Sequence, residues 1–288
     1  MASRASNILL IVITLLTLGS CKKNPFSNGE VITEERGLPG NITAFDIRDD
    51  ISVTFVKSDF PHLEIKTGAN LIEGITTTVT DNRLVLRNEN KLNWMRPYDY
   101  PLEVTVFFNE LNTINYESIG TVKSLDSIRG IAEISYDTII TLDSVLVFDT
   151  IIIDSLIIID SSWHTEQHIH INEISRNFFY LNINGGSGDI DLLLSCDWSR
   201  TNYQFGTSKV TLRGKTVFNA VFNGSYGPIQ SEELFSNYVY LQSRGYNDNF
   251  VWSTYEIDAA LYGIGNLYYK GDPEILNCND WGKLKRLE

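Results

Sequence analysis

From Asn41 onward, apolar and polar residues follow one another in short runs, and no apolar period of 3.6 residues extends over a helical length. Short runs rich in Val, Ile, Thr and aromatic residues predict β-strands. Asp81-Asn82 separates two such runs at the spacing of a tight hairpin turn, and Asn70–Gly74 is predicted as one helical turn. We therefore expect an antiparallel or mixed β segment from Asn41 to about Leu111. Its predicted strands are Ile51–Lys57, Leu63–Thr67, Thr76–Thr80, Arg83–Arg87 and Leu102–Phe108.

A five-residue motif rich in Gly, Asn and Ser recurs in the second half at intervals of 20, 19, 20 and 18 residues. After most copies come a short strand, a polar turn and a second strand, as in Val210–Leu212, Arg213–Lys215 and Val217–Phe222. Gly and Asn accept the positive φ that a sharp corner needs. The copies are Gly186–Ile190, Gly206–Val210, Ser225–Ile229, Gly245–Asn249 and Gly263–Leu267, and an earlier copy is Ser118–Val122.

A repeat of this length, filled with short strands, is typical of one turn of a β-solenoid, in which each strand pairs with its equivalent in the next turn. We therefore predict an all-β fold: a right-handed β-helix-like solenoid with rungs of about 19 residues, preceded by the antiparallel or mixed β segment. The alternative is an antiparallel sandwich with regularly spaced turns.

Residues 134–163 separate the opening segment from the repeats, and five Asp residues in them are each followed by Ser or Thr. This pattern predicts strands of about four residues alternating with side-chain-capped turns. The alternative is an acidic ladder that binds divalent cations. Because the run is long, apolar and β-prone, we expect it to be buried. The Asp residues are Asp137, Asp143, Asp149, Asp154 and Asp160.

The N-terminus has the pattern of an export signal. Residues 1–29 contain no acidic residue, Arg4 is basic, and Ile8–Leu18 is an apolar run too short to span a bilayer. Leu18-Gly19-Ser20-Cys21 follows and resembles a bacterial lipobox. We predict a lipoprotein signal peptide over residues 1–20, lipid attachment at Cys21, and an outer-membrane lipoprotein of the cell envelope that faces the periplasm. An ordinary signal peptide or a short membrane anchor is the alternative.

The composition excludes some partners. The chain has 288 residues and a formal net charge of −13, with 43% hydrophobic residues. This hydrophobic content is that of a globular core and differs from that of a disordered chain. A strongly acidic chain repels a phosphate backbone, so no nucleic-acid partner is expected.

Three stretches carry a resemblance to a known family: Ala44–Lys57 with Leu63–Asn70 and Ile75–Leu86, then Gly185–Ile190, and finally Tyr262–Pro273. They resemble the putative auto-transporter adhesin, head GIN domain family. The resemblance implies a β-helix-like fold in an envelope protein that is lipid-anchored or secreted, and it supplies no catalytic residues. The resulting organisation is a signal peptide at residues 1–20, a tether at 21–40, a head GIN-like β-solenoid domain at 41–275 and a C-terminal tail or cap at 276–288.

The sequence predicts no metal and no cofactor. Gly185–Asp191 approaches a Ca²⁺-binding nonapeptide, but Asp189 falls one position early. His164, His168 and His170 could supply only part of a zinc site, so an exposed polar face is the preferred interpretation. Cys196 and Cys278 would lie about four rungs, or about 19 Å, apart. Since a disulfide needs Cα atoms within roughly 7 Å, we predict two free, buried thiols.

We predict a non-enzymatic, lipid-anchored envelope protein that presents a β-solenoid for adhesion or scaffolding. The expected partners are the membrane, through the lipid, and a cell-surface polysaccharide or an envelope protein. The alternatives are a glycan-binding module and a β-helix polysaccharide lyase or hydrolase. The C-terminal aromatic residues are expected to fill or stack along the solenoid, whereas an outward row would favour glycan binding. These residues are Tyr238, Tyr240, Tyr246, Phe250, Trp252, Tyr255, Tyr262, Tyr268 and Tyr269.

Overall fold

The computed structural model describes residues 27–91, 100–153 and 156–288, and it describes side chains for these residues outside 134–174. Two units are distinguished. Unit 1 comprises the described residues up to Ile131 together with Phe178–Glu288, and unit 2 is Ala132–Asn177. The described residues contain no α-helix, only two short 3-10 turns, at Ile72–Gly74 and Trp281–Lys283, and their strands form a mixed sheet. No helix among the described residues is long and apolar enough to cross a membrane.

The opening strands of unit 1 confirm the predicted β segment. The hairpin of β5 and β6 turns through Asp81-Asn82, and Asp81 has a φ of 55°. Antiparallel pairs join β1 to β4, β4 to β7 and β5 to β6, whereas β2 pairs in parallel with β6 and β8, and β3 in parallel with β7 and β9. The strands are β1 (Val31–Gly37), β2 (Ala44–Asp49), β3 (Ser52–Lys57), β4 (His62–Gly68), β5 (Ile75–Thr80), β6 (Arg83–Asn88), β7 (Glu103–Phe108), β8 (Thr113–Ser118) and β9 (Val122–Ser124).

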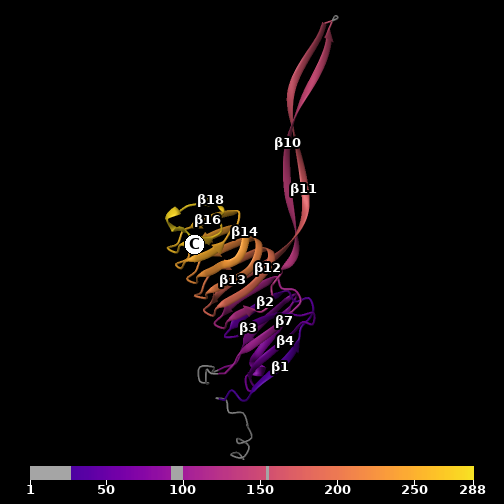
Figure 1. Ribbon diagram of the computed structural model, residues 1–288. Helices are drawn as coiled ribbons and strands as arrows, with labels where there is room; N and C mark the ends of the chain where they lie inside the picture. Colours follow the sequence, from indigo (N-terminus) through magenta and orange to yellow (C-terminus); the bar gives the residue numbers. More distant parts are fainter. Residues whose placement is uncertain (1–26, 92–99, 154–155) are drawn as a thin grey trace, which may run out of the picture. The chain divides into compact units, whose positions relative to one another are not determined.

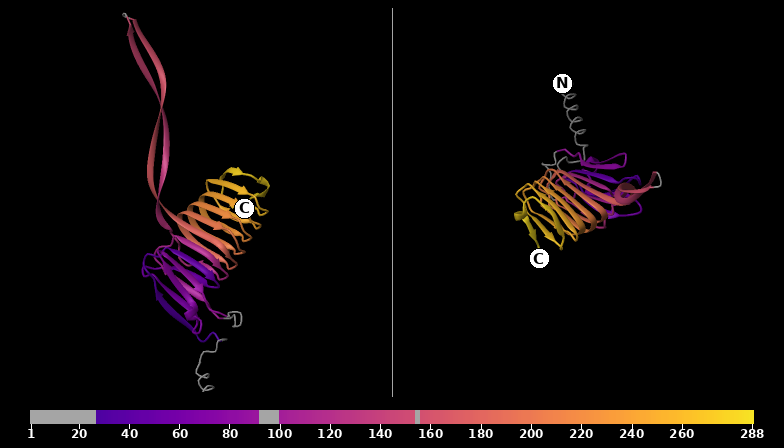
Figure 2. Two further views of the ribbon diagram at one scale, coloured as in Figure 1. Left: turned by 180° about the vertical axis from the view of Figure 1, so that it is seen from behind. Right: turned by 90° about the horizontal axis from the view of Figure 1, so that it is seen from above.

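Parallel strands follow in two rows, which Figures 1 and 2 show as the orange and yellow part of the ribbon. In one row, β8 pairs with the end of β11, followed by the second halves of β12, β13 and β14, then β16 and β18. In the other, β9 is followed by the first halves of β12, β13 and β14, then β15, β17 and β19. The bounds are β11 (Leu156–Gly186), β12 (Ile190–Tyr203), β13 (Val210–Asn223), β14 (Ile229–Ser243), β15 (Asn249–Trp252), β16 (Glu256–Leu261), β17 (Leu267–Lys270), β18 (Glu274–Cys278) and β19 (Leu284–Arg286).

The predicted five-residue motifs lie in register on neighbouring strands. The last residues of successive motifs are direct partners, in the order Val122, Ile190, Val210, Ile229, Asn249 and Leu267. Their corners approach closely: a Cβ on Gly227 would lie 2.1 Å from the carbonyl oxygen of Ser208, and one on Gly265 would lie 2.1 Å from that of Asn247. Glycine is therefore required at both corners because no side chain fits between the stacked turns.

A continuous apolar core lies between the two rows. Phe179, Leu181 and Ile183 point inward from β11, and Ile190, Leu192 and Leu194 point inward from β12. Because side chains alternate along a strand, the residues between them point outward. The core also extends through the opening strands.

Two features differ from the prediction. Val31–Gly37 pairs with β4 as strand β1, so this part of the predicted tether is wrong. The predicted polar turn at Arg213–Lys215 lies inside the continuous strand β13. Gly214, at a φ of 106°, supplies a bend in β13 where a separate turn was expected. After Pro273, β18 adds a strand to the row of β16, and β19 adds a strand to the row of β17.

Unit 2 differs most from expectation. It belongs to two long strands, β10 (Ile131–Ile153) and β11, which lie side by side in Figures 1 and 2. Asp137, Asp143 and Asp149 therefore lie within a strand and form no turn. Their spacing of six residues is a multiple of the strand period of two, so the same Asp-Ser/Thr pattern is compatible with a continuous strand. Asp154 lies outside the described residues, and Asp160 lies on β11.

Candidate binding site on the outer aromatic face

The outward side chains of β11 to β14 form columns, because the strands pair in parallel and in register. One column contains Phe178, Trp198, Phe218 and Tyr238, each a direct partner of the next. A hollow of about 390 Å³ lies on the outside of these strands, and we call the surface that lines it the outer aromatic face. Its residues are Phe178, Tyr180, Trp198, Arg200, Phe218, Ala220, Phe222 and Tyr240.

Ring contacts connect this face along the stack. Trp198 and Phe218 are stacked with centroids 4.2 Å apart and an interplanar angle of 21°, and Phe178 lies 5.6 Å from Trp198. Phe222 and Tyr240 are 5.5 Å apart. The rings are half-buried, so part of each remains open to solvent. Such contacts hold the rings in place and stabilise each pair by about 0.5–1.5 kcal/mol.

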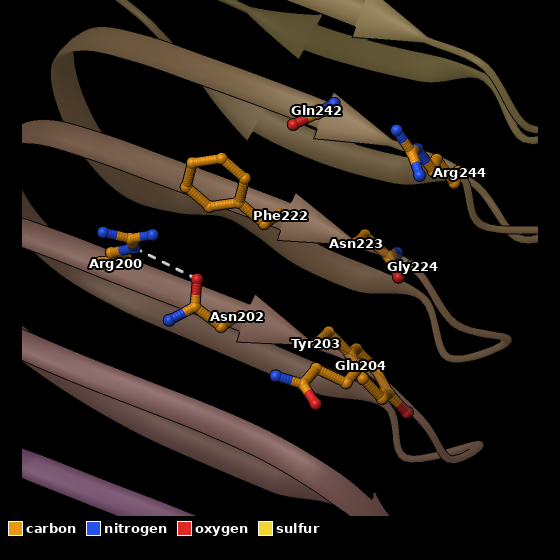
Figure 3. A pocket seen from close by; sticks show the side chains of 9 residues that line it. All are labelled: Arg200, Asn202, Tyr203, Gln204, Phe222, Asn223, Gly224, Gln242 and Arg244. Carbon is orange, nitrogen blue, oxygen red and sulfur yellow. Dashed lines mark hydrogen bonds between the residues drawn. The ribbon is translucent and has the colours of Figure 1, made fainter.

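An arginine pocket of about 520 Å³ adjoins this face (Figure 3) and shares Arg200 and Phe222 with it. The guanidinium carbon of Arg200 lies 4.8 Å from the centre of the Phe222 ring. Arg244 follows the end of β14, and its guanidinium carbon lies 5.8 Å from the centre of the Tyr262 ring. The pocket lining is Arg200, Asn202, Tyr203, Gln204, Phe222, Asn223, Gly224, Gln242 and Arg244, with no acidic residue among them.

A ladder of side-chain amides leads to Arg200 across four neighbouring strands. Asn115 donates to Asp46 at 2.6 Å, and Asn182 donates to Asn115 at 2.9 Å. Asn202 donates to Asn182 at 2.7 Å and accepts a hydrogen bond from Arg200 Nε at 3.1 Å. Asn115 and Asn182 each donate toward the preceding strand and accept from the following one, whereas the oxygen of Asn202 accepts from Arg200 of its own strand. The ladder fixes Asn202 and, through it, the guanidinium of Arg200.

Buried hydroxyl and thiol groups support the site from inside. Tyr203 Oη donates to the carbonyl oxygen of Ser208 at 2.9 Å, and burial raises the pKa of Tyr203 to about 12. The Cys196 thiol contacts Thr216 Oγ1 at 3.8 Å, and burial raises the pKa of this thiol to about 12. Both groups are therefore neutral at pH 7. Cys196 and Cys278 are free and buried, which confirms the prediction for the two thiols.

The other residues that the sequence analysis weighed as sites do not belong to this face. Asp191 of the calcium-like motif forms an ion pair with Arg213 at 2.9 Å, so its carboxylate already has a partner. The described residues contain no group of three metal-ligating side chains. His164, His168 and His170 lie on β11, within the part whose side chains are not described, and Cys21 lies outside the described residues.

The C-terminal aromatic residues do not fill the interior, but several stack on neighbouring rings, as Phe250 does on Tyr268 and Tyr246 on Tyr226, which agrees with the second part of the expectation. None of the nine C-terminal aromatic residues is buried, and Tyr246, Tyr255 and Tyr262 are exposed. The residues that the sequence analysis missed are Phe178, Tyr180, Trp198, Arg200, Phe218 and Phe222. A signal for them exists: Phe178, Trp198, Phe218 and Tyr238 are separated by 20 residues each, and each directly precedes an inward residue of its strand.

These features define a class: an all-β protein whose successive parallel strands share a core and present a ladder of outward side chains. Within that class, the chain belongs to the family described as putative auto-transporter adhesin, head GIN domain, whose model matches residues 41–273. The resemblance seen in the sequence is thereby confirmed. No curated protein matches the sequence.

Solved structures share the fold. A putative adhesin from Bacteroides fragilis is similar, with 18% identity, a TM-score of 0.64, and coverage of 90% of this chain and 95% of that one. A putative adhesin from Parabacteroides merdae has 13% identity, a TM-score of 0.50, and coverage of 90% and 95%. A putative lipid binding protein from Parabacteroides distasonis has 14% identity, a TM-score of 0.50, and coverage of 91% and 98%. At these identities the likeness shows the fold alone.

Proposed function

We propose that this chain is a non-enzymatic adhesion protein of the bacterial cell envelope, anchored by lipid at Cys21, which binds surface polysaccharide through the outer aromatic face. The observation that carries the proposal is the outward direction of the aromatic column from Phe178 to Tyr238. Ring faces pack against the C–H faces of sugars, and binding sites combine such rings with a few polar groups. The membership of a family described as adhesins supports this function.

We further propose that the two rows of parallel strands are the two faces of a right-handed β-solenoid. Partners in neighbouring turns are separated by 17 to 20 residues, from Ile190–Val210 to Leu267–Leu284, close to the rung of about 19 residues. Right-handed connections between parallel strands are the rule. In a solenoid, neighbouring rings lie one strand spacing apart, so an extended polymer crossing the strands would meet one ring per turn.

Neither the hollow of the outer aromatic face nor the adjoining arginine pocket is lined by an acidic residue. A glycoside hydrolase requires a pair of carboxyl groups beside the bound sugar, so the lining supports binding and gives no support to hydrolysis. A smaller hollow of about 180 Å³ does contain Asp46 and Glu117. Asp46 already binds Arg83 at 3.3 Å and Asn115 at 2.6 Å, which fits a structural role.

Retention on polysaccharides tests the proposal. The purified protein in detergent is run through native gels containing neutral or acidic polysaccharides, and its mobility is compared with that in a gel without polymer. We expect retardation by at least one polymer and its loss in Trp198→Ala. Tyr268→Ala is the matched control, since Tyr268 also stacks on a neighbouring ring, that of Phe250 at 5.0 Å, but belongs to the other row. Unchanged mobility of Trp198→Ala, or equal loss in both variants, contradicts the assignment to this face.

A further inference from the structure

The arginine pocket is positively charged, although the chain as a whole is strongly acidic. The chain has 36 acidic and 23 basic residues, yet the pocket contains two arginines and no carboxylate. Neither Arg200 nor Arg244 forms an ion pair with a carboxylate of the described residues. Other arginines of unit 1 are paired, including Arg83 with Asp46, Arg213 with Asp191 and Arg286 with Asp272. The pocket thus leaves two guanidinium groups available for a ligand.

Arg200 is positioned before any ligand arrives. Its Nε donates to Asn202, and its guanidinium lies over the ring of Phe222 (Figure 3). These contacts leave the two terminal nitrogens for a carboxylate or another planar anion, which guanidinium groups bind with two parallel hydrogen bonds. Because the side chain is already ordered, binding costs little conformational entropy.

The nearest acidic residue in the same column is far enough to leave this charge effective. Arg200, Ala220, Tyr240 and Asp258 are successive partners on neighbouring strands. Three strand spacings of about 4.8 Å separate Asp258 from Arg200, or about 14 Å. That distance exceeds the screening length of about 8 Å at physiological salt, so Asp258 does not cancel the attraction of an anion to Arg200.

The remaining lining matches a polyhydroxylated ligand. Asn202, Gln204 and Gln242 carry amides that both donate and accept hydrogen bonds, as sugar hydroxyl groups do. The aromatic hollow shares Arg200 and Phe222 with the pocket, so rings and charge belong to one surface. An isolated phosphate would use the arginines and leave the rings without a ligand.

From these observations we propose that the outer aromatic face and the adjoining arginine pocket select acidic polysaccharides, with carboxylates of different uronic acid residues bound at Arg200 and at Arg244 and neighbouring sugar rings packed on Trp198 and Phe218. This inference rests on the proposed function, because it names the substrate class of the same face. It adds a requirement that neutral sugar binding lacks: loss of the carboxylate must weaken the complex.

The test compares one polymer in two forms. Polygalacturonate and its carboxyl-reduced product share the sugar backbone and differ in charge, and their affinities for the purified full chain are measured by affinity electrophoresis. We expect polygalacturonate to bind at least about tenfold more tightly, because a charge-assisted hydrogen bond contributes more than a neutral one. Arg244→Gln should lose about tenfold of its affinity for polygalacturonate and keep its affinity for the reduced polymer within about twofold.

Lys215→Gln is the control for overall charge, since Lys215 is exposed and lies in the half of β13 that belongs to the other row. It should bind both polymers as the wild-type protein does, and circular dichroism should show the same melting temperature for all three proteins. Equal affinity of the wild-type protein for the two polymers overturns this inference and leaves the proposed function standing. An equal loss of affinity for polygalacturonate in Arg244→Gln and Lys215→Gln likewise overturns this inference and leaves the proposed function standing. Binding of neither polymer by the wild-type protein overturns the inference, and if no neutral polysaccharide binds either, the proposed function fails as well.

Discussion

The guanidinium of Arg200 lies 4.8 Å from the centre of the Phe222 ring, so an arginine of β12 rests on an aromatic ring of the next strand. Arg200 and Phe222 are not direct partners, since Arg200 pairs with Ala220. The small side chain of Ala220 leaves room for the guanidinium to lie diagonally across β13. The cation–π contact contributes about 0.5–2 kcal/mol and holds the charge at the rim of the pocket.

Phe222→Leu tests this contact. Leucine keeps an apolar side chain at the position and removes the ring face, so Arg200 should lose part of its orientation. We expect a loss of about three- to tenfold in affinity for polygalacturonate, with a change in unfolding free energy of about 1 kcal/mol, measured by affinity electrophoresis and urea unfolding. An affinity equal to that of the wild-type protein would show that the ring has no part in positioning Arg200.

The hydroxyl group of Tyr203 is expected to stabilise the corner at Ser208. Tyr203→Phe removes the donor to the Ser208 carbonyl oxygen and leaves that acceptor without this partner inside the protein. The expected loss of unfolding free energy is about 1–2 kcal/mol, measured by the midpoint of urea unfolding. Tyr226→Phe is the control, because Tyr226 is exposed at the next corner, and it should change the stability by less than about 0.5 kcal/mol.

The close approach of neighbouring corners makes Gly227 intolerant of any side chain. A Cβ there would meet the Ser208 carbonyl oxygen at 2.1 Å and the Tyr203 hydroxyl at 2.2 Å. Gly227→Ala should therefore force backbone movement and lower the melting temperature by several degrees. Gly224→Ala, three residues earlier, meets nothing closer than 3.4 Å and should melt within about 1–2 °C of the wild-type protein. Equal melting temperatures for the two variants would contradict the stacking of the corners.

Lipid attachment at Cys21 remains a prediction from the sequence alone. Cys21→Ser removes the thiol that would carry the diacylglycerol, so the variant should lose incorporation of a labelled fatty acid and move from the membrane fraction to the soluble fraction or remain unprocessed. Membrane association that persists in this variant would favour the short membrane anchor. Ser20→Ala keeps a small residue before the cysteine and should be labelled as the wild-type protein is.

The sequence predicted most of the repeat and little of the outer aromatic face. The motif spacing of 18 to 20 residues places Ile190, Val210, Ile229, Asn249 and Leu267 on neighbouring strands, and the structure pairs each with the next. Corners are readable because a local requirement, positive φ or the absence of a side chain, selects Gly and Asn. The direction of an aromatic side chain depends instead on the parity of its position within a strand, and an error of one residue in a strand boundary reverses it.

The segment that separates the opening strands from the repeats also shows how far local sequence patterns can predict structure. In unit 2, strand β10 includes Asp137, Asp143 and Asp149, where turns were expected. Asp-Ser and Asp-Thr favour turns by local hydrogen bonding, but β-branched residues on both sides favour an extended chain. The balance also depends on the pairing of β10 with β11 (Figure 1), which the propensities along a single strand do not specify.

Alkaline pH should weaken the fold through Cys196. The folded protein raises the pKa of this thiol from 9.0 to about 12, mainly because burial penalises the thiolate. Below pH 9 both states keep the proton, and the thiol adds no pH dependence. Above pH 9 the unfolded chain releases its proton while the folded chain retains it, so the unfolding free energy falls as pH rises. This loss continues until the pH reaches the folded pKa and amounts to about 4 kcal/mol at most.

The pKa of Tyr203 is also raised by burial, from its ordinary value of 10.0, so its effect on the unfolding free energy has the same sign and begins about one pH unit higher. The interval from pH 9 to pH 10 therefore separates the two groups. Urea unfolding across this interval should show a decrease of about 1 kcal/mol in the wild-type protein and a distinctly smaller one in Cys196→Ala, whatever stability that variant loses at pH 7. Parallel pH profiles for the two proteins would show that the buried thiol does not govern the alkaline response.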